Sequence, residues 1–116
     1  MSELNRKDRD ILEHIESYCL DVQDAINRFG KSYEIFKEDR DYYKSVSMSV
    51  YQIAELTIHL SDEFKKDNKG FEWQQIKGMR NQFANGYVKM DPETIWNTAI
   101  NDIPDILSLC EEIRSL

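Results

Sequence analysis

Apolar residues at three- and four-residue steps are the feature that most restricts the fold of this chain. Across residues 7–29 they line one face of a long amphipathic helix: Ile11, Ile15, Tyr18, Val22, Ile26 and Phe29. Similar spacing predicts a second long helix over residues 41–66, a third from about residue 72, and a fourth from residue 91 towards the C-terminus. Four such helices can bury their apolar faces only against one another. We therefore predict an all-α, antiparallel four-helix bundle with a short extra helix.

Residues that commonly start or end helices fall at the boundaries of these segments. Gly30 follows the first helix and suits a left-handed helix end, and Ser32 can cap a short helical turn. Asp91 and Pro92 form a favourable start for the last helix. Pro104 lies inside that helix, removes one amide donor and predicts a bend.

The second predicted helix carries more apolar side chains than one packing partner requires. The additional residues are Tyr42, Tyr43, Met48, Tyr51, Leu56 and Ile58. Apolar surface of this extent favours burial between subunits, so we expect a homodimer.

Size and composition favour one globular domain spanning residues 1–116. The chain is 41% hydrophobic and 32% charged, which is typical of a folded protein with solvated helices. Its net charge of -7 opposes a phosphate backbone. Any RNA partner would therefore have to bind a local basic patch, because the overall negative charge of the protein repels RNA.

Two features bear on the expected cellular location. Cys19 and Cys110 are far apart in the sequence and each lies in a helix-like stretch, so we expect reduced core thiols. The N-terminal residues lack an apolar signal region, and no apolar run approaches membrane-spanning length. We expect a cytoplasmic protein with no membrane contact.

Histidine and carboxylate residues form no complete metal-binding pattern. Asp10 and His14, and likewise His59 and Asp62, share a helical face without further ligands nearby, which is typical of solvent-facing side chains. We predict no metal and no cofactor, and we assign neither histidine to catalysis.

Residues 80–87, RNQFANGY, gather several chemically distinctive side chains at the end of a predicted helix. In an ideal helix Arg80 and Tyr87 lie about 20° apart around the axis, whereas Arg80 and Asn85 lie about 140° apart. Arg80 and Asn85 can share a face if the helix ends early, as Gly86 permits, or if a two-fold axis brings a second copy alongside. On spacing alone a structural role is more common, with Arg80 paired to a carboxylate and Asn85 bonded to a terminal carbonyl.

This stretch resembles the signature of the HepT-like toxins of the HEPN superfamily, in which Arg, four residues, His, one residue and Tyr form a ribonuclease site. The resemblance extends upstream over residues 73–81, WQQIKGMRN. Downstream it includes residues 90–91, 95–96 and 102–104, and looser agreement occurs at Phe36, residues 39–40 and residues 53–55. The resemblance covers nearly the whole chain and implies a helical, dimeric ribonuclease toxin.

The resemblance also implies roles for individual residues and a protein partner. Arg80 matches the arginine that binds phosphate and stabilises the transition state, and Asn81 matches the polar residue that follows it. Tyr87 matches a tyrosine that accepts AMP from a minimal nucleotidyltransferase antitoxin of the MntA type. RNA and this transferase are therefore the expected partners, beside a second copy of the chain.

Asn85 occupies the position at which the family has its catalytic histidine. A carboxamide cannot exchange a proton near neutral pH, so ribonuclease activity is expected to be weak or absent. The sequence leaves open an RNA-positioning amide, a naturally inactive relative, or an introduced His-to-Asn change. The alternative function is a non-catalytic partner of the nucleotidyltransferase, modified with AMP on Tyr87.

Overall fold

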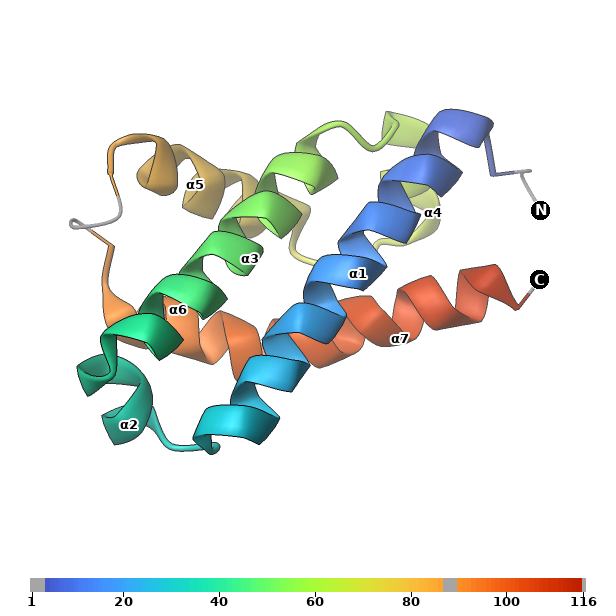
Figure 1. Cartoon of the computed structure of the whole chain (residues 1–116). Coiled ribbons are helices and arrows are strands. Elements are labelled where there is room, and N and C mark those ends of the chain that lie inside the picture. The colour runs from blue at the N-terminus through green and yellow to red at the C-terminus, as the bar shows by residue number, and fades with distance from the viewer. Residues whose placement is uncertain (1–3, 87–89, 116) are drawn as a thin grey trace.

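The computed structural model describes residues 4–86 and 90–115, and this part of the chain is all-α, as predicted. The two longest helices are α1 (Arg6–Phe29) and α3 (Arg40–Ile58), which lie side by side and antiparallel (Figure 1). Helix α5 (Trp73–Ala84) packs on α3, and α7 (Ile103–Arg114) packs on α1. The shorter segments are α2 (Tyr33–Glu38), α4 (Asp62–Asp67), α6 (Pro92–Asn97) and the π-helical turn η2 (Thr98–Asp102). The arrangement is a HEPN-like helical bundle.

The ends of α1 and of its neighbours follow the predicted caps. Gly30 ends α1 at a φ of 109°, a conformation that side chains other than glycine rarely adopt. The Ser32 hydroxyl accepts the Ile35 amide at 3.3 Å and begins α2. Asp91 accepts the Glu93 amide at 3.1 Å and begins α6. These three predictions are confirmed.

The prediction of one continuous helix over residues 41–66 is wrong, because the chain breaks between α3 and α4. The buried Asp8 carboxylate accepts the Ser61 backbone amide at 2.9 Å and the Ser61 hydroxyl at 2.6 Å. The same hydroxyl oxygen accepts the Phe64 amide at 3.1 Å, so Ser61 is also the N-cap of α4. A contact from α1 therefore fixes this break, and local spacing could not reveal it.

The last predicted helix contains the irregularity expected near Pro104, in the form of a π-helical turn. The Ile103 amide bonds to the Thr98 carbonyl five residues earlier, where a regular helix would bond four residues back. Pro104 has no amide hydrogen to donate to the Ile100 carbonyl, and its ring crowds that carbonyl. The wider turn immediately before Pro104 accommodates both effects, and α7 continues beyond it.

Aromatic side chains join α2, α3 and α6 within the core. Tyr42 is fully buried, and its hydroxyl donates to the Gly30 carbonyl at 2.9 Å. The Phe36 ring lies 5.4 Å from the Tyr42 ring and 5.2 Å from the Trp96 ring, measured between centroids. The largest fully buried side chains of the described residues include Tyr42, Phe36, Ile15, Ile95, Ile103, Val22, Val46 and Val50.

The surplus apolar surface expected on residues 41–66 is smaller than predicted. Tyr42 belongs to the core, Tyr43, Tyr51 and Leu56 are half-buried against it, and Ile58 is half-buried. Among the predicted surplus residues, only Met48 is exposed, at 50% of its surface. Other helices cover part of this surface: Phe36 of the short α2 packs on Tyr42 and Tyr43, and Phe83 of α5 packs on Tyr51.

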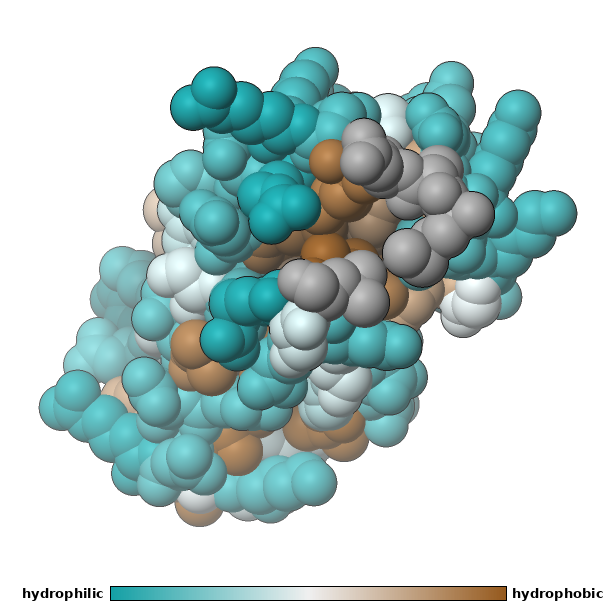
Figure 2. Space-filling model, turned by 90° about the vertical axis from the view of Figure 1, so that its right-hand side faces the viewer, coloured by the Kyte–Doolittle hydropathy of each residue, from teal (hydrophilic) through white to brown (hydrophobic). Residues whose placement is uncertain are grey.

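Helix α1 begins and α7 ends at the same end of the molecule, opposite the region where α5 ends and α6 begins (Figure 1). Figure 2 views the molecule from the former end and shows a mostly hydrophilic surface around a smaller apolar area. No helix within residues 4–86 and 90–115 is long and apolar enough to cross a membrane.

Candidate phosphate-binding site on α5

Helix α5 is fixed against α3 by side chains on its inner face. Phe83 is buried, and its ring lies 5.4 Å from that of Tyr51 on α3. Ile76 is buried about two turns earlier, and the Trp73 indole donates to the Asn68 carbonyl at 3.1 Å. These contacts set the rotation of α5 and so determine where Arg80 points.

The helix ends immediately after Ala84, as Gly86 predicts. The Gly86 amide bonds to the Phe83 carbonyl at 2.9 Å, and Gly86 has a φ of 115°. Asn85 is the exposed residue between the last helical residue and this turn. Tyr87, the expected AMP acceptor, lies outside the described residues.

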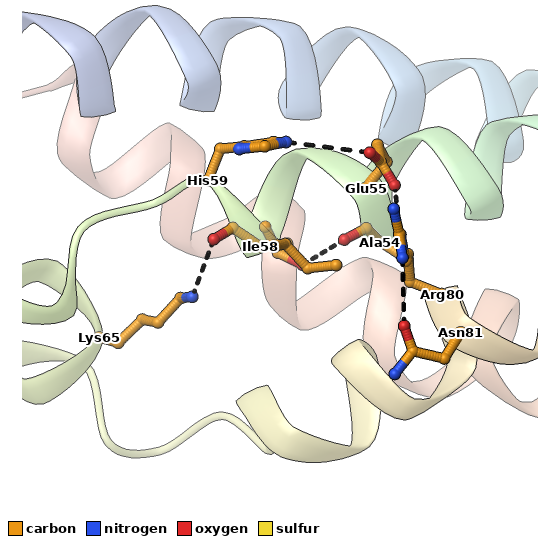
Figure 3. Close-up of polar contacts among 8 residues, drawn as sticks. Ala54, Glu55, Ile58, His59, Lys65, Arg80 and Asn81 are labelled. Atoms are coloured by element: carbon orange, nitrogen blue, oxygen red, sulfur yellow. Dashed lines mark hydrogen bonds and ion pairs between the residues drawn. The ribbon is translucent and has the colours of Figure 1, made fainter. Parts of the chain in front are cut away.

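Arg80 forms the centre of a polar cluster between α5 and α3 (Figure 3). Its Nε donates to Oε2 of Glu55 at 2.6 Å, and its Nη1 donates to Oδ1 of Asn81 at 3.2 Å. About a third of the Arg80 side chain is exposed, at 35%. The guanidinium is thus held from two directions while remaining open to solvent.

Hydrogen bonding between Arg80 and Glu55 stabilises the charged form of both groups. The bond from Arg80 lowers the pKa of the Glu55 carboxyl below its usual value. The bond to Glu55 likewise raises the pKa of the Arg80 guanidinium. At neutral pH the site therefore holds a carboxylate and a permanently charged cation side by side.

His59 lies at the other oxygen of the same carboxylate, a position that the sequence analysis did not assign to it. Its Nε2 is 3.8 Å from Oε1 of Glu55, and 58% of its side chain is exposed. The signal was present in the sequence, because Glu55 and His59 are four residues apart and hence neighbours on a helix. The sequence pattern also pairs His59 with Asp62, but Asp62 belongs to α4, beyond the break.

The structure brings some predicted site residues together and separates others. Arg80 and Asn81 are in direct contact. Asn85 shares no hydrogen bond with Arg80 within the described part of the chain, in agreement with their wide angular separation. The structural role that spacing predicts for Arg80, pairing with a carboxylate, is present as well, because Arg80 forms an ion pair with Glu55. Asn81 accepts from Arg80 and does not cap the helix.

The remaining candidate groups lie away from this cluster. His14 is exposed on α1 next to Asp10, which is also exposed. Cys19 and Cys110 are buried free thiols, as predicted. Among residues 4–86 and 90–115, no three histidine, cysteine or carboxylate side chains are grouped so that they could hold a metal ion.

A separate groove of about 430 Å³ runs along another side of α5, between that helix and the α6–η2 segment. Its wall includes Gly78, Met79 and Asp102. Burial, and to a lesser extent the nearby Asp105, raises the pKa of the Asp102 carboxyl. Arg80 is not among the lining residues, so the groove and the Arg80 cluster are distinct surfaces.

Comparisons with known proteins point to one family. A family model described as "Ribonuclease HepT-like" matches residues 9–113. "Putative RNase TTE0752" of Caldanaerobacter subterraneus subsp. tengcongensis is 29% identical over 105 residues, which are 90% of this chain and 92% of that protein. "Probable ribonuclease HepT" of Thermococcus cleftensis is 24% identical over 113 residues, 96% of this chain and 99% of that protein.

A third relative, "Putative RNase MJ0127" of Methanocaldococcus jannaschii, is 27% identical over 104 residues, 90% of this chain and 81% of that protein. No solved structure gives a significant match. The family model covers residues 9–113, which include all of α2 to η2 and most of α1 and α7. The chain belongs to the HepT-like ribonuclease family.

Proposed function

We propose that this protein is a toxin-type, RNA-binding ribonuclease of a toxin–antitoxin pair, with its phosphate site at Arg80. The observation that supports the proposal is the guanidinium held by Glu55 and Asn81 with a third of its side chain open to solvent. Arginine is suited to phosphate because its planar group donates several hydrogen bonds and never loses its charge. Asn81 adds an amide beside it for a neighbouring phosphate or ribose oxygen.

A second copy of the chain completes the proposed site. With a net charge of -7, one protomer repels RNA overall, and Glu55 offsets part of the charge of Arg80. A two-fold axis close to α5 would place two Arg80 side chains near one phosphodiester and double the local positive charge. RNA binding is then expected to depend on dimer formation.

Asn85 lowers the expected activity of this site. General acid or base catalysis by a positioned side chain contributes roughly 10²- to 10⁴-fold to a rate, and a carboxamide supplies none of it. Asn85 is exposed at the end of α5, so its amide can contact RNA without transferring a proton. We expect slow cleavage by the chain that carries Asn85 and faster cleavage after Asn85→His.

Incubation of labelled RNA with the purified protein, its Asn85→His form and its Arg80→Ala form tests the proposal. Arg80→Ala is expected to weaken RNA binding and to abolish cleavage. Arg114→Ala is the matched control, because Arg114 also donates to a glutamate, Glu16, but on the α1–α7 side of the molecule. If neither the natural nor the Asn85→His protein cleaves RNA, and Arg80→Ala binds RNA as well as Arg114→Ala does, the proposal is wrong.

The second candidate function is that of a protein substrate for an MntA-type nucleotidyltransferase antitoxin, with AMP transferred to Tyr87. What favours it is the end of α5, where Gly86 turns the chain out of the helix directly before Tyr87. Once a partner enzyme supplies base and metal, a tyrosine hydroxyl attacks the α-phosphate of ATP, the bond to the β-phosphate breaks, and pyrophosphate leaves. Mass spectrometry after incubation with an active transferase and ATP is expected to show one AMP adduct, which Tyr87→Phe removes.

A further inference from the structure

Three side chains that carry or exchange charge are linked in series across α3 and α5: His59 contacts Glu55, and Glu55 contacts Arg80 (Figure 3). Glu55 contacts the imidazole with Oε1, at 3.8 Å, and the guanidinium with Oε2, at 2.6 Å. One carboxylate therefore holds a histidine beside the proposed phosphate-binding arginine. Position 85, where the family signature has its histidine, lacks an imidazole.

We propose that His59 is the proton-transfer residue of the Arg80 site and that Glu55 positions it. This inference rests on the proposed function and names a residue outside the motif of residues 80–87. Imidazole is the side chain whose charge changes most readily near neutral pH. His59 is exposed at 58%, so that substrate can reach it, and it is more exposed than Glu55 or Arg80.

The packing of α5 on α3 places His59 and Asn85 on opposite sides of Arg80. Arg80 lies opposite Glu55 and Phe83 lies opposite Tyr51, so the two helices run antiparallel. Along α5, Asn85 follows Phe83 and so lies towards the C-terminal end of that helix. Along α3, His59 lies one turn after Glu55, which in this antiparallel pair is the opposite direction. A group that assists an attacking oxygen has to lie on the side of the phosphorus away from the leaving oxygen. A phosphate bound at Arg80 would have His59 on one side and Asn85 on the other.

The step that we assign to His59 is removal of the proton from a ribose 2′-hydroxyl. The neutral imidazole takes this proton, the 2′-oxygen forms a bond to phosphorus, and the bond from phosphorus to the 5′-oxygen breaks. The leaving 5′-oxygen takes a proton from water. Arg80 stabilises the charge that develops on the phosphoryl oxygens, and Glu55 stabilises the imidazolium that results.

Few other charged groups face His59. Glu55 lies on its own helix, and Arg80 reaches the same carboxylate from α5. Lys65 of α4 donates to the neighbouring Ile58 carbonyl at 3.4 Å. Asp8 of α1 accepts hydrogen bonds from Ser61, which lies two residues after His59 in the chain. In the described part of the chain, Glu55 is the carboxylate in ion-pair range of His59.

The test compares RNA cleavage by the natural protein and by His59→Ala, Glu55→Gln and His14→Ala from acidic to alkaline pH. His59→Ala is expected to lower kcat by about 10²-fold or more and to remove the rise in rate as imidazole loses its proton. Glu55→Gln is expected to reduce kcat while retaining an oxygen that accepts from Arg80. His14→Ala is the matched control, since His14 is an exposed histidine on α1, and its rate should equal that of the natural protein.

The outcomes separate this inference from the proposed function. If His59→Ala cleaves RNA as fast as the natural protein while Arg80→Ala does not, His59 transfers no proton and the proposed function stands. If the natural protein is inactive but Asn85→His is active, His59→Ala is made in that background, where an unchanged rate overturns the inference and a reduced rate supports it. If neither protein cleaves RNA, the inference is wrong, and the proposed function is wrong as well when Arg80→Ala binds RNA as tightly as Arg114→Ala does. Thermal melts of His59→Ala that match those of the natural protein exclude misfolding as the cause of a lower rate.

Discussion

At the scale of single residues, one buried carboxylate decides where the second long helix ends. Asp8 is 2% exposed and accepts hydrogen bonds from Asn5 Nδ2, from the Ser61 amide and from the Ser61 hydroxyl. A buried carboxylate is tolerated only when such donors surround it. Asp8 thus joins the start of α1 to the start of α4, although the sequence pattern marks it only as one charged residue among many.

Replacement of Asp8 by alanine is expected to destabilise the fold by about 2–3 kcal/mol, because hydrogen bonds to a charged group are lost and buried donors are left unpaired. The free energy of unfolding in urea measures this change. Asp10→Ala is the control, since Asp10 is exposed on the same helix and should have little effect. Equal stability of the two variants would show that the Asp8 contacts contribute nothing net.

At the scale of helices, spacing predicted which segments are helical, and long-range contacts decided where they are interrupted. Glycine shows the contrast within one residue type. Gly30 has a φ of 109°, which the end of α1 requires, whereas Gly78 lies inside α5, where an added Cβ would meet no atom within 4 Å. Glycine inside a helix is destabilising because it loses more conformational entropy on folding than other residues do. At Gly78, no neighbouring atom in the described chain requires the absence of a side chain.

Gly78→Ala is accordingly expected to stabilise the protein by about 0.5–1 kcal/mol. Gly30→Ala is expected to destabilise it by about 1–2 kcal/mol, because alanine disfavours a positive φ. Urea unfolding of both variants measures the two effects with opposite signs. A loss of stability in Gly78→Ala would mean that this face of α5 is covered in solution, and would contradict the expectation.

At the scale of the whole molecule, the packing of α7 on α1 removes two thiols from solvent. Cys19 on α1 is 0% exposed and Cys110 on α7 is 4% exposed. Burial raises the pKa of Cys110 to about 12, and burial together with the neighbouring Cys110 raises the pKa of Cys19 as well. Because the reactive form of a thiol is the thiolate, both groups should be inert in the folded protein.

Titration with a thiol-specific disulfide reagent at mildly alkaline pH checks this expectation. The folded protein should react slowly, at the rate of its unfolding, and both thiols should react at once in denaturant. Rapid reaction of one thiol in the folded protein would show that the α1–α7 contact opens locally. Asp8→Ala, measured in parallel, should react faster because unfolding is more frequent.

The sequence by itself determined the all-helical class, the caps at Ser32 and Asp91, the end of α5 near Gly86 and the motif that contains Arg80. These features depend on neighbours along the chain, whose preferences can be read locally. Only the tertiary structure decided the break at Ser61, the burial of Tyr42 and the placement of Glu55 and His59 beside Arg80. Each of these depends on how α1, α3 and α5 are rotated against one another, and that rotation is set by the packing of distant residues.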